Sequence, residues 1–568
     1  MGLMNASLHI GRTALLSYQS ALQTVGSNIS SAASPDYTRL TPQLVPLQGP
    51  LITGNLQPGA GVALTGIQRN IDEALESRIR DAIGAQESGA TQRTSLSQVE
   101  AFLDDVDGTG VNSRLRDLFS SFDNLQNTPE DGATRDLVLS AGAQLAESLK
   151  ALRANFAALG EDLDGQIAGI VGSADELARR IGDLNEEITT AEAGRNGQAT
   201  GLRDQRDALL RDLSELFDVT VRRQPDGVIN VYIGSEALIQ GNFVRQLVAV
   251  QEFDGEFART SVRFADTNGE VDVRGGRLQG LITSRDEHGY GQVELADKLA
   301  HALIAQLNQV HADGQGLVGF ESVTGSYSLL ATDVALNATE AGLAFTPRNG
   351  SFFITVADNA TGTPIAYRVD VAFNELGQET TLESLVADIN AQVQDVTATI
   401  TAGNRLTLTA AEGFTFTLGH DGQTAREDTS NVLASLGINT FFTGTDARNI
   451  AVSDVLTQRP MLVAAASAFH AGDGGNAGLL ATLETSASTE LDGATIRGFY
   501  NSILSASAVA SAAARDDLEA SSSILSSLSA QKESISGVNL DEEAISLLKF
   551  ERAFQGVSRF VSVVDGLI

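Results

Sequence analysis

The chain has 568 residues, a formal net charge of -34, an isoelectric point near 4.4 and no cysteine. That length allows roughly three or four domains, each with its own core. The negative charge argues against a nucleic-acid or anionic-membrane surface, because phosphate binding depends on lysine and arginine. The lack of cysteine excludes disulfides, thiolate nucleophiles and cysteine-ligated metals.

The beginning of the chain gives no sign of a membrane span or a cleaved leader. No run of about 18 apolar residues occurs, so no membrane span is expected. The N-terminus also lacks the basic start and compact apolar core of a signal peptide. A secreted protein of this kind would therefore need a route that cleaves no leader.

The first residues predict a helix of coiled-coil type, because apolar side chains recur about every 3.5 residues. The residue before Pro35 is biased away from helix, so the helix should stop there. The proline- and glycine-rich stretch from Leu40 to Gly66 then predicts an extended, partly β connector. The apolar series comprises Met1, Met4, Leu8, Leu15, Tyr18, Leu22, Val25 and Ile29, with Gly11 as its one break.

Helical periodicity resumes near Ile71 and returns at Leu96, Val99, Leu103 and Val106. A longer apolar series runs from Leu145 to Ala191 and exceeds a usual globular helix. We therefore predict a rod-like helical bundle, formed by residues 36–218 and 451–535 together with the β connector.

Two regions with β periodicity interrupt this helical pattern. The stretch "VINVYIG", Val228–Gly234, predicts a mainly-β domain at 219–320, followed by a helix over Gln292–Val310 that stops at Gly314. Residues 321–450 predict a variable, acidic α+β outer domain with alternating strands. Its one helix should begin with a capping box of Thr380 and Glu383.

The helical period is expected to return near Val455 and to continue to the C-terminus, with Asn539 capping the last helix. Burying six large apolar side chains contributes on the order of 10 kcal/mol, whereas ordering a terminal helix costs roughly 1–2 kcal/mol per residue. Either neighbouring subunits cover these ends or the two ends pair within the chain. Further apolar residues off the main series, including Ile545, Leu548 and Phe560, favour several neighbours. The last series comprises Leu540, Ala544, Leu547, Phe550, Phe554, Val557, Val561, Val564 and Ile568.

The search for catalytic, metal and cofactor motifs yields little. The six histidines are scattered, and His301 and His311 are expected at the surface or cap of one helix. The stretch "DVDGTGVNSRLR" resembles a calcium loop, but Arg116 stands where a bidentate glutamate is required, so we predict a polar turn. "HAGDGGNAG" lacks the Lys-Ser/Thr of a phosphate loop and is interpreted as a turn between helices. We expect no enzyme, no metal and no cofactor.

The elbow after the first helix resembles that of the axial proteins of the bacterial flagellum. Their signature is similar to N-I-A-N-x-x-T-P-G-Y, and "NISSAASPDY" matches it at Asn28, Ile29, Pro35 and Tyr37. Asp36 replaces the usual glycine. The resemblance implies that the first helix begins at Met1 because it is itself the assembly element, and that the elbow is where it leaves the inner tube.

Further segments narrow the resemblance to the hook-associated protein 1 family, which forms the hook–filament junction. They are the stretches 115–146, 201–221, 275–286 and 307–319 and the C-terminal ending, "GVNLDEEAISLLKFERAFQGVSRFVSVVDGLI". The signature residues carried by these matches are Asp204, Arg206, Asp207, Asn308, His311 and Gly314.

The resemblance implies an α+β multidomain protein, an elongated helical coiled bundle closed by both termini with inserted mainly-β domains. It implies a structural subunit that joins hook to filament, self-associates in a ring, contacts the hook protein and the next junction protein, and is held before export by a flagellar chaperone. Export would follow the type III route to an extracellular flagellum. Residues 1–35 and 536–568 would be the terminal assembly helices. Their interface side chains are Leu8, Leu15, Tyr18, Leu22, Val25, Ile29, Leu547, Phe550, Phe554, Val557, Val561, Val564 and Ile568.

Two alternatives stay open at this point. A sibling axial protein of hook, rod or filament type would share the end helices, although it should lack the "DQRD" and "NQVHADG" elements. A binding or enzymatic function in residues 321–450 is the other, although no clustered histidines or paired carboxylate motifs support it.

Overall fold

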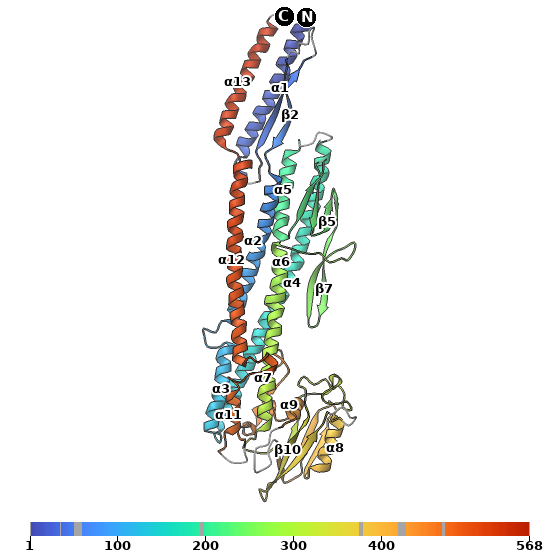
Figure 1. Ribbon diagram of the computed structural model, residues 1–568, viewed down its shortest axis with the longest axis vertical. Coiled ribbons are helices and arrows are strands. Elements are labelled where there is room, and N and C mark those ends of the chain that lie inside the picture. The colour runs from blue at the N-terminus through green and yellow to red at the C-terminus, as the bar shows by residue number, and fades with distance from the viewer. Residues whose placement is uncertain are drawn as a thin grey trace. The chain divides into compact units, whose positions relative to one another are not determined.

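The computed structural model describes residues 2–34, 36–49, 59–192, 198–225, 227–373, 379–418, 428–467 and 472–566. Met1, Pro35 and Ile568, which the sequence singled out, lie outside these residues. The fold is α+β and multidomain, with long helices and several small sheets (Figure 1). Two compact units divide the chain: the first comprises residues 1–95, 161–285 and 511–568, and the second 96–160 and 286–510.

The terminal part of the first unit consists of two helices and a hairpin. α1 (Gly2–Ser31) lies beside α13 (Leu540–Asp565) and also packs on β1 (Leu40–Gln48) and β2 (Gly59–Arg69), which pair antiparallel (Figure 1). Ser17 joins α1 to the hairpin, because its Oγ donates to the Val62 carbonyl at 3.0 Å and accepts from the Leu64 N–H at 3.1 Å. Asn539 caps α13 as predicted, accepting from the N–H groups of Asp541 and Glu542.

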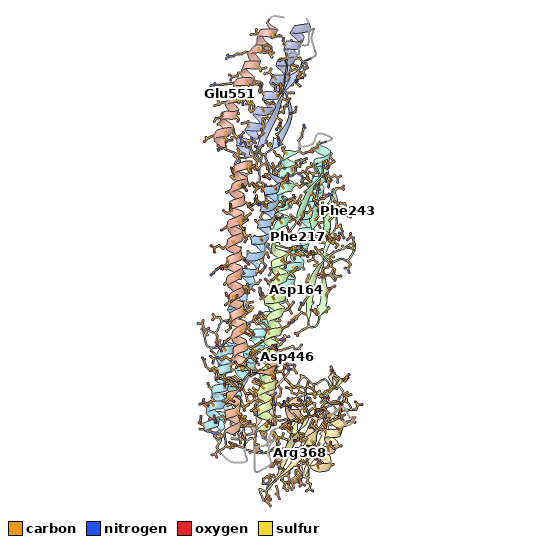
Figure 2. The ribbon with its side chains drawn as sticks, in the orientation of Figure 1. Asp164, Phe217, Phe243, Arg368, Asp446 and Glu551 are labelled. Carbon is orange, nitrogen blue, oxygen red and sulfur yellow. The ribbon has the colours of Figure 1, made fainter. Side chains whose placement is uncertain are left out.

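The rest of the first unit places small sheets against helices. Asn185 of α4 contacts the end of the two inner strands of one sheet, because its Nδ2 donates to the carbonyls of Ile229, which begins β4, and Gly241, which follows β5. Figure 2 labels Phe217, which is buried just after α5, and Phe243, which is exposed on β6. The elements of this part are α2 (Glu73–Leu103), α4 (Gly132–Glu192), α5 (Thr200–Leu216), β3 (Thr220–Arg223), β4 (Ile229–Ile233), β5 (Glu236–Gln240), β6 (Phe243–Val244), β7 (Leu247–Asp254), β8 (Phe257–Phe264), α6 (Gly276–Thr283) and α12 (Ile496–Ser536); α2, α4 and α12 also contribute residues to the second unit.

The second unit combines helices with two three-stranded sheets. The sheets have the orders β11-β10-β14 and β12-β13-β9, and α8 packs on β11 and β12. Its elements are α3 (Val111–Asn127), the π-helical turn Ser284–Tyr290, α7 (Gly291–Asp313), β9 (Ser322–Thr324), β10 (Gly350–Asp358), β11 (Pro364–Val371), α8 (Leu382–Gln392), β12 (Val396–Ile400), β13 (Leu406–Ala410), β14 (Phe414–Leu418), α9 (Val432–Leu436), β15 (Phe442–Thr443), β16 (Ala451–Val452), α10 (Asp454–Gln458) and α11 (Gly475–Thr482).

Several predicted elements are confirmed. α4 contains the long apolar series, α7 ends at Gly314, and strands occupy both predicted β regions. The polar turn is also confirmed, because the Asp105 carboxylate accepts from the N–H groups of Gly110 and Ser113 at the start of α3.

Three predictions at element ends are wrong. The N-cap of α8 is Thr381, whose capping box closes with Ser384, because Thr380 Oγ1 instead accepts from the Ala372 N–H. Val106 is 86% exposed, since α2 ends at Leu103. Only short helices occur in the described residues between 455 and 495, where Pro460 begins a 3-10 turn and glycines with positive φ break the pattern. The fourfold division of the chain given above remains an interpretation of the sequence.

Candidate functional site

The two terminal apolar series face each other within the chain. Most members of both series that the structure describes are half-buried and Val25 is fully buried, but Leu540 and Ala544 at the start of α13 are exposed. The rings of Tyr18 and Phe550 have their centroids 6.4 Å apart. Gly11 allows the close approach, because a Cβ there would lie 2.3 Å from Cγ2 of Val561. The structure therefore pairs the predicted interface residues with one another, as the internal alternative required.

A second apolar face on α13 is largely uncovered within the described chain. Ile545 is 68% exposed, Val563 63% and Leu548 56%; Phe560, at the border of this face, is 43% exposed and its ring lies beside Gly11 of α1. Ile545 and Val563 are separated by five helical turns, so they point the same way, with Leu548 and Phe560 on either side of that direction. Leaving such side chains in water forgoes about 1.5–3 kcal/mol each. Association that buries this face would therefore be favourable.

Asn28 is the centre of the elbow between α1 and β1. It is buried, and its Nδ2 donates to the Leu40 carbonyl at 2.9 Å and to Glu543 Oε2 at 3.0 Å. Its Oδ1 accepts from the Leu40 N–H at 3.0 Å and from the Tyr37 hydroxyl at 2.8 Å. Burial raises the pKa of Tyr37, so the hydroxyl remains a donor. All four hydrogen-bonding positions of the amide are used, which fixes the path of the chain out of α1.

Glu543 and Arg39 complete this elbow, and the sequence did not identify them. The buried Glu543 carboxylate accepts from Arg39 Nε at 2.8 Å, while Arg39 Nη1 contacts Glu542 at 2.8 Å. Asp36, which departs from the family signature, pairs with Arg211 of α5 at 2.5 Å. The elbow thus ties together the end of α1, the start of α13 and α5.

The predicted residues Asp204 and Asp207 of α5 meet at Arg69, the last residue of β2. Arg69 Nη2 lies 2.6 Å from an oxygen of each carboxylate. Although burial opposes it, the charges of Asp207 and Asp204 raise the pKa of Arg69. The arginine is therefore a fixed cation at the point where the hairpin meets α5.

Arg206, the third signature residue of α5, is fully buried away from any carboxylate partner. Its Nη1 donates to Asn185 Oδ1 at 2.8 Å and to the Gly227 carbonyl at 3.0 Å. Burial lowers its pKa to about 10. Arg206 therefore links α5, α4 and the turn before β4, whereas the neighbouring Arg203 pairs with Glu192 through two contacts of 2.9 Å.

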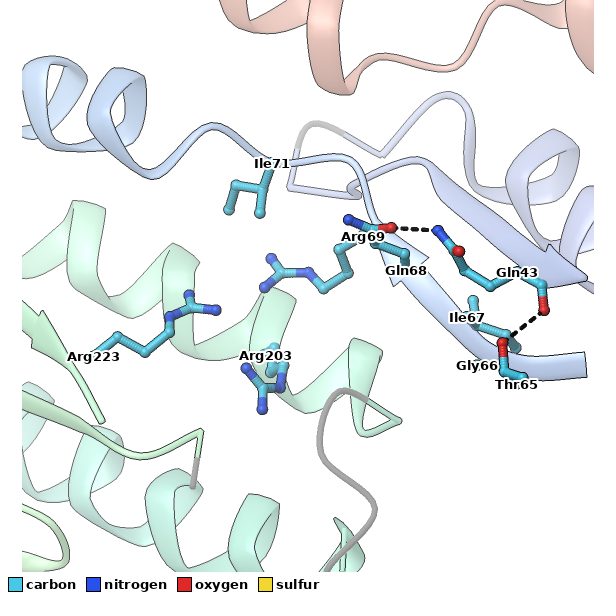
Figure 3. Close-up of a pocket in the computed structure, with 9 residues that line it drawn as sticks. All are labelled: Gln43, Thr65, Gly66, Ile67, Gln68, Arg69, Ile71, Arg203 and Arg223. Carbon is cyan, nitrogen blue, oxygen red and sulfur yellow. Dashed lines mark hydrogen bonds between the residues drawn. The ribbon is translucent and has the colours of Figure 1, made fainter. Parts of the chain in front are cut away.

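A cavity of about 420 Å³ opens beside this network (Figure 3). Arg69, Arg203 and Arg223 line it, and they come from β2, α5 and β3. The remaining lining residues belong to β1 and β2 or follow directly after β2.

The signature residues of α7 have a structural role in the second unit. Asn308 Nδ2 donates to the Phe442 carbonyl, and its Oδ1 accepts from the N–H groups of Phe441 and Phe442. Gly314 allows Asn476 to approach, because a Cβ there would lie 2.0 Å from Asn476 Nδ2. These contacts hold α7 against β15 and against α11.

His311 does not lie at the surface as predicted; it is fully buried. Its Nδ1 lies 2.8 Å from the Asn439 carbonyl, and its Nε2 accepts from the Ala464 N–H at 3.0 Å. These partners require the neutral ring with its proton on Nδ1, and burial lowers the pKa to about 4. Both ring nitrogens are therefore used for backbone contacts.

The described residues contain no group of three or more histidine, aspartate or glutamate side chains that could hold a metal ion. Likewise, none of the helices in the described ranges is long and apolar enough to cross a membrane. What the arrangement offers is a paired helical terminus with an uncovered apolar face, fixed to its unit by buried ion pairs.

Comparisons with known proteins find similarity to hook-associated proteins. The domain described as the flagellar hook-associated protein FlgK helical domain matches residues 96–325. The chain is 25% identical to flagellar hook-associated protein 1 of Escherichia coli over 587 residues, covering 99% of this chain and 98% of that protein. It is 24% identical to the protein of the same name from Salmonella typhimurium over 578 residues, covering 99% of each. A solved structure of the flagellar hook junction protein FlgK from Burkholderia pseudomallei matches 81% of this chain and 100% of that chain, with 16% identity and a TM-score of 0.49.

Proposed function

We propose that the chain is a member of the hook-associated protein 1 family of flagellar axial proteins, a structural subunit that joins the flagellar hook to the filament. The similarity extends over 99% of the chain, so it includes both terminal helices as well as the domains between them. The role is non-enzymatic: the signature residues Asn28, Asn308 and His311 are all occupied by structural hydrogen bonds.

The observation that supports assembly through the termini is the uncovered apolar face of α13. The paired series holds α1 and α13 together within one subunit, while Ile545, Leu548, Phe560 and Val563 remain exposed. Neighbouring copies in a ring would cover this face, and the half-buried members of the series would contribute their exposed edges. Association would thereby recover burial that a single copy leaves unused.

The resemblance to the family also suggests the individual binding partners. One side of the ring would contact the hook protein and the other the next hook–filament junction protein. Before export by the type III route, a flagellar chaperone would cover Leu540–Ile568, and the chain would reach the extracellular flagellum unfolded. The absence of cysteine suits a chain that must refold outside the cell without disulfides.

The test of the junction role is electron microscopy of cells that lack this protein. Hooks without filaments are expected, together with monomeric filament protein in the medium. Removal of residues 540–568 should leave the central region folded but abolish chaperone binding and incorporation. Normal filaments in the deletion strain would contradict the proposed role.

Point variants separate the apolar face from the rest of α13. Ile545→Asp with Val563→Asp should leave the monomer folded, because both positions are exposed, yet prevent incorporation. Ser558→Asp is the matched control, since it is exposed on α13 outside the apolar face. Equal incorporation of both variants would refute assembly through this face.

A further inference from the structure

The cavity lined by Arg69, Arg203 and Arg223 brings three guanidinium groups together in a strongly acidic protein. Figure 3 shows Arg69 and Arg223 extending toward one another, with Arg203 below them, and the three come from different elements. Because the chain carries a formal net charge of -34, a cluster of three arginines requires a physical explanation.

The carboxylates that pair with these arginines do not line the cavity. Arg203 pairs with Glu192 and Arg223 pairs with Glu73. Arg69 pairs with Asp204 and Asp207. The six other residues that line the cavity carry no acid; they are Gln43, Thr65, Gly66, Ile67, Gln68 and Ile71.

One buried hydrogen-bond donor remains unused at this cavity. The Arg69 side chain is only 6% exposed, and its Nη1 has no hydrogen-bond partner. Arg203 reaches Glu192 through Nε and Nη2, and Arg223 reaches Glu73 through Nη2. A guanidinium has five N–H donors, and leaving a buried donor without a partner costs stability.

We propose that Arg69, Arg203 and Arg223 form a binding site for a small oxyanion, a phosphate or a carboxylate. Guanidinium groups match the planar oxygen pairs of these anions and donate charge-assisted hydrogen bonds to them. The cavity volume of about 420 Å³ accommodates such an anion together with bound water. A bound anion would join β2, α5 and β3, and would so brace the hairpin that packs on α1.

The test is isothermal titration calorimetry of the full-length monomer with inorganic phosphate, at constant ionic strength set with sodium chloride. One saturable site is expected. Arg223→Gln should weaken phosphate binding about tenfold, as expected for the loss of one charge-assisted hydrogen bond. This variant keeps the fold, because the Arg223 side chain is one-third exposed and its partner Glu73 is half exposed.

Arg222→Gln is the matched control. Arg222 precedes Arg223 on β3 and changes the net charge equally, but it lies over the Tyr232 ring at 5.1 Å and does not line the cavity. Phosphate affinity in this variant should stay within about twofold of the unaltered protein, because long-range attraction is screened at physiological salt. Equal weakening by the two variants, or no saturable binding of either phosphate or malonate to the unaltered protein, would overturn the proposal.

A parallel titration with malonate distinguishes the source of the anion. Binding of phosphate alone assigns the site to free phosphate. Binding of malonate with the same dependence on Arg223 supports a carboxylate, such as an acidic side chain of a neighbouring chain.

Discussion

Asn28 shows how much one side chain contributes at the elbow. Asn28→Ala removes four hydrogen bonds and leaves the buried Glu543 carboxylate and the Leu40 backbone with fewer partners. We expect a loss of about 2–4 kcal/mol in the local stability of the terminal helices. Hydrogen exchange of the α1 amides measures this loss directly.

The control for this prediction is Ser30→Ala. Ser30 is exposed and donates only to the carbonyl of Ser27 within the same helix. In this variant, the free energies of exchange of the α1 amides should change by less than about 0.5 kcal/mol. Comparable exchange in the two variants would show that the elbow does not depend on Asn28.

His311 predicts a pH dependence of the second unit. Its pKa is lowered from 6.5 to about 4 in the folded chain, so the unfolded chain binds more protons between these values. Stability therefore falls as the pH drops from about 6.5 to 4, by about 3 kcal/mol, and this contribution is fully present above pH 6.5. The measurement is urea unfolding of the unaltered chain and of His311→Asn at several pH values. The variant should be less stable at neutral pH and lose less stability over that interval; parallel curves would contradict the assignment.

The signature residues were predictable from the sequence, but their partners were not. The resemblance identified Asn28, Asp204 and His311, whereas Glu543 lies 515 residues from Asn28 and looked like an ordinary acid in the first turn of a helix. Only the fold brings that carboxylate to the elbow. The burial of His311 was missed for the same reason, because its backbone partners belong to segments more than 100 residues away.

At the scale of elements, apolar periodicity predicted the long helices because each buries one continuous stripe. α4 and α7 have buried residues at the predicted spacing. The prediction of the α8 N-terminus failed because a single hydrogen bond determines where that helix begins. Thr380 and Thr381 are adjacent threonines with equal capping ability, and the N–H of Ala372, on a preceding strand end, selects between them.

The pairing of α1 with α13 can be tested by two glycines of the same helix. Gly11→Ala places a Cβ 2.3 Å from Val561 and should force the helices apart, at a cost of about 1–3 kcal/mol that exceeds the helix-propensity gain. Gly26→Ala meets no atom within 4 Å and should stabilise α1 by about 1 kcal/mol. Hydrogen exchange in α1 should therefore change in opposite directions. A gain in protection for Gly11→Ala would show that the helices are not packed closely there.

At the scale of the whole molecule, the composition was enough to exclude several classes of function, but it could not predict which parts of the chain contact one another. The charge and the lack of cysteine hold for any arrangement of the chain. Periodicity could not decide whether the terminal series pair with each other or with neighbours, since both choices bury the same stripe. The structure pairs the two series within the chain, as the interpretation of internal pairing required. It leaves the outer side chains of α13 exposed, so cover by neighbouring subunits stays a proposal for that face.

Charge and the apolar face of α13 act in opposite directions on association. Copies that each carry a formal charge of -34 repel one another, and salt screens that repulsion, whereas burial of apolar side chains is little weakened by salt. Raising sodium chloride from about 0.05 to about 0.5 M should therefore promote self-association of the purified chain, measured by analytical ultracentrifugation. The variant with Ile545→Asp and Val563→Asp should stay monomeric at both concentrations, while Ser558→Asp should associate like the unaltered chain. Association that weakens as salt rises would mean that ion pairs, and not this face, hold the copies together.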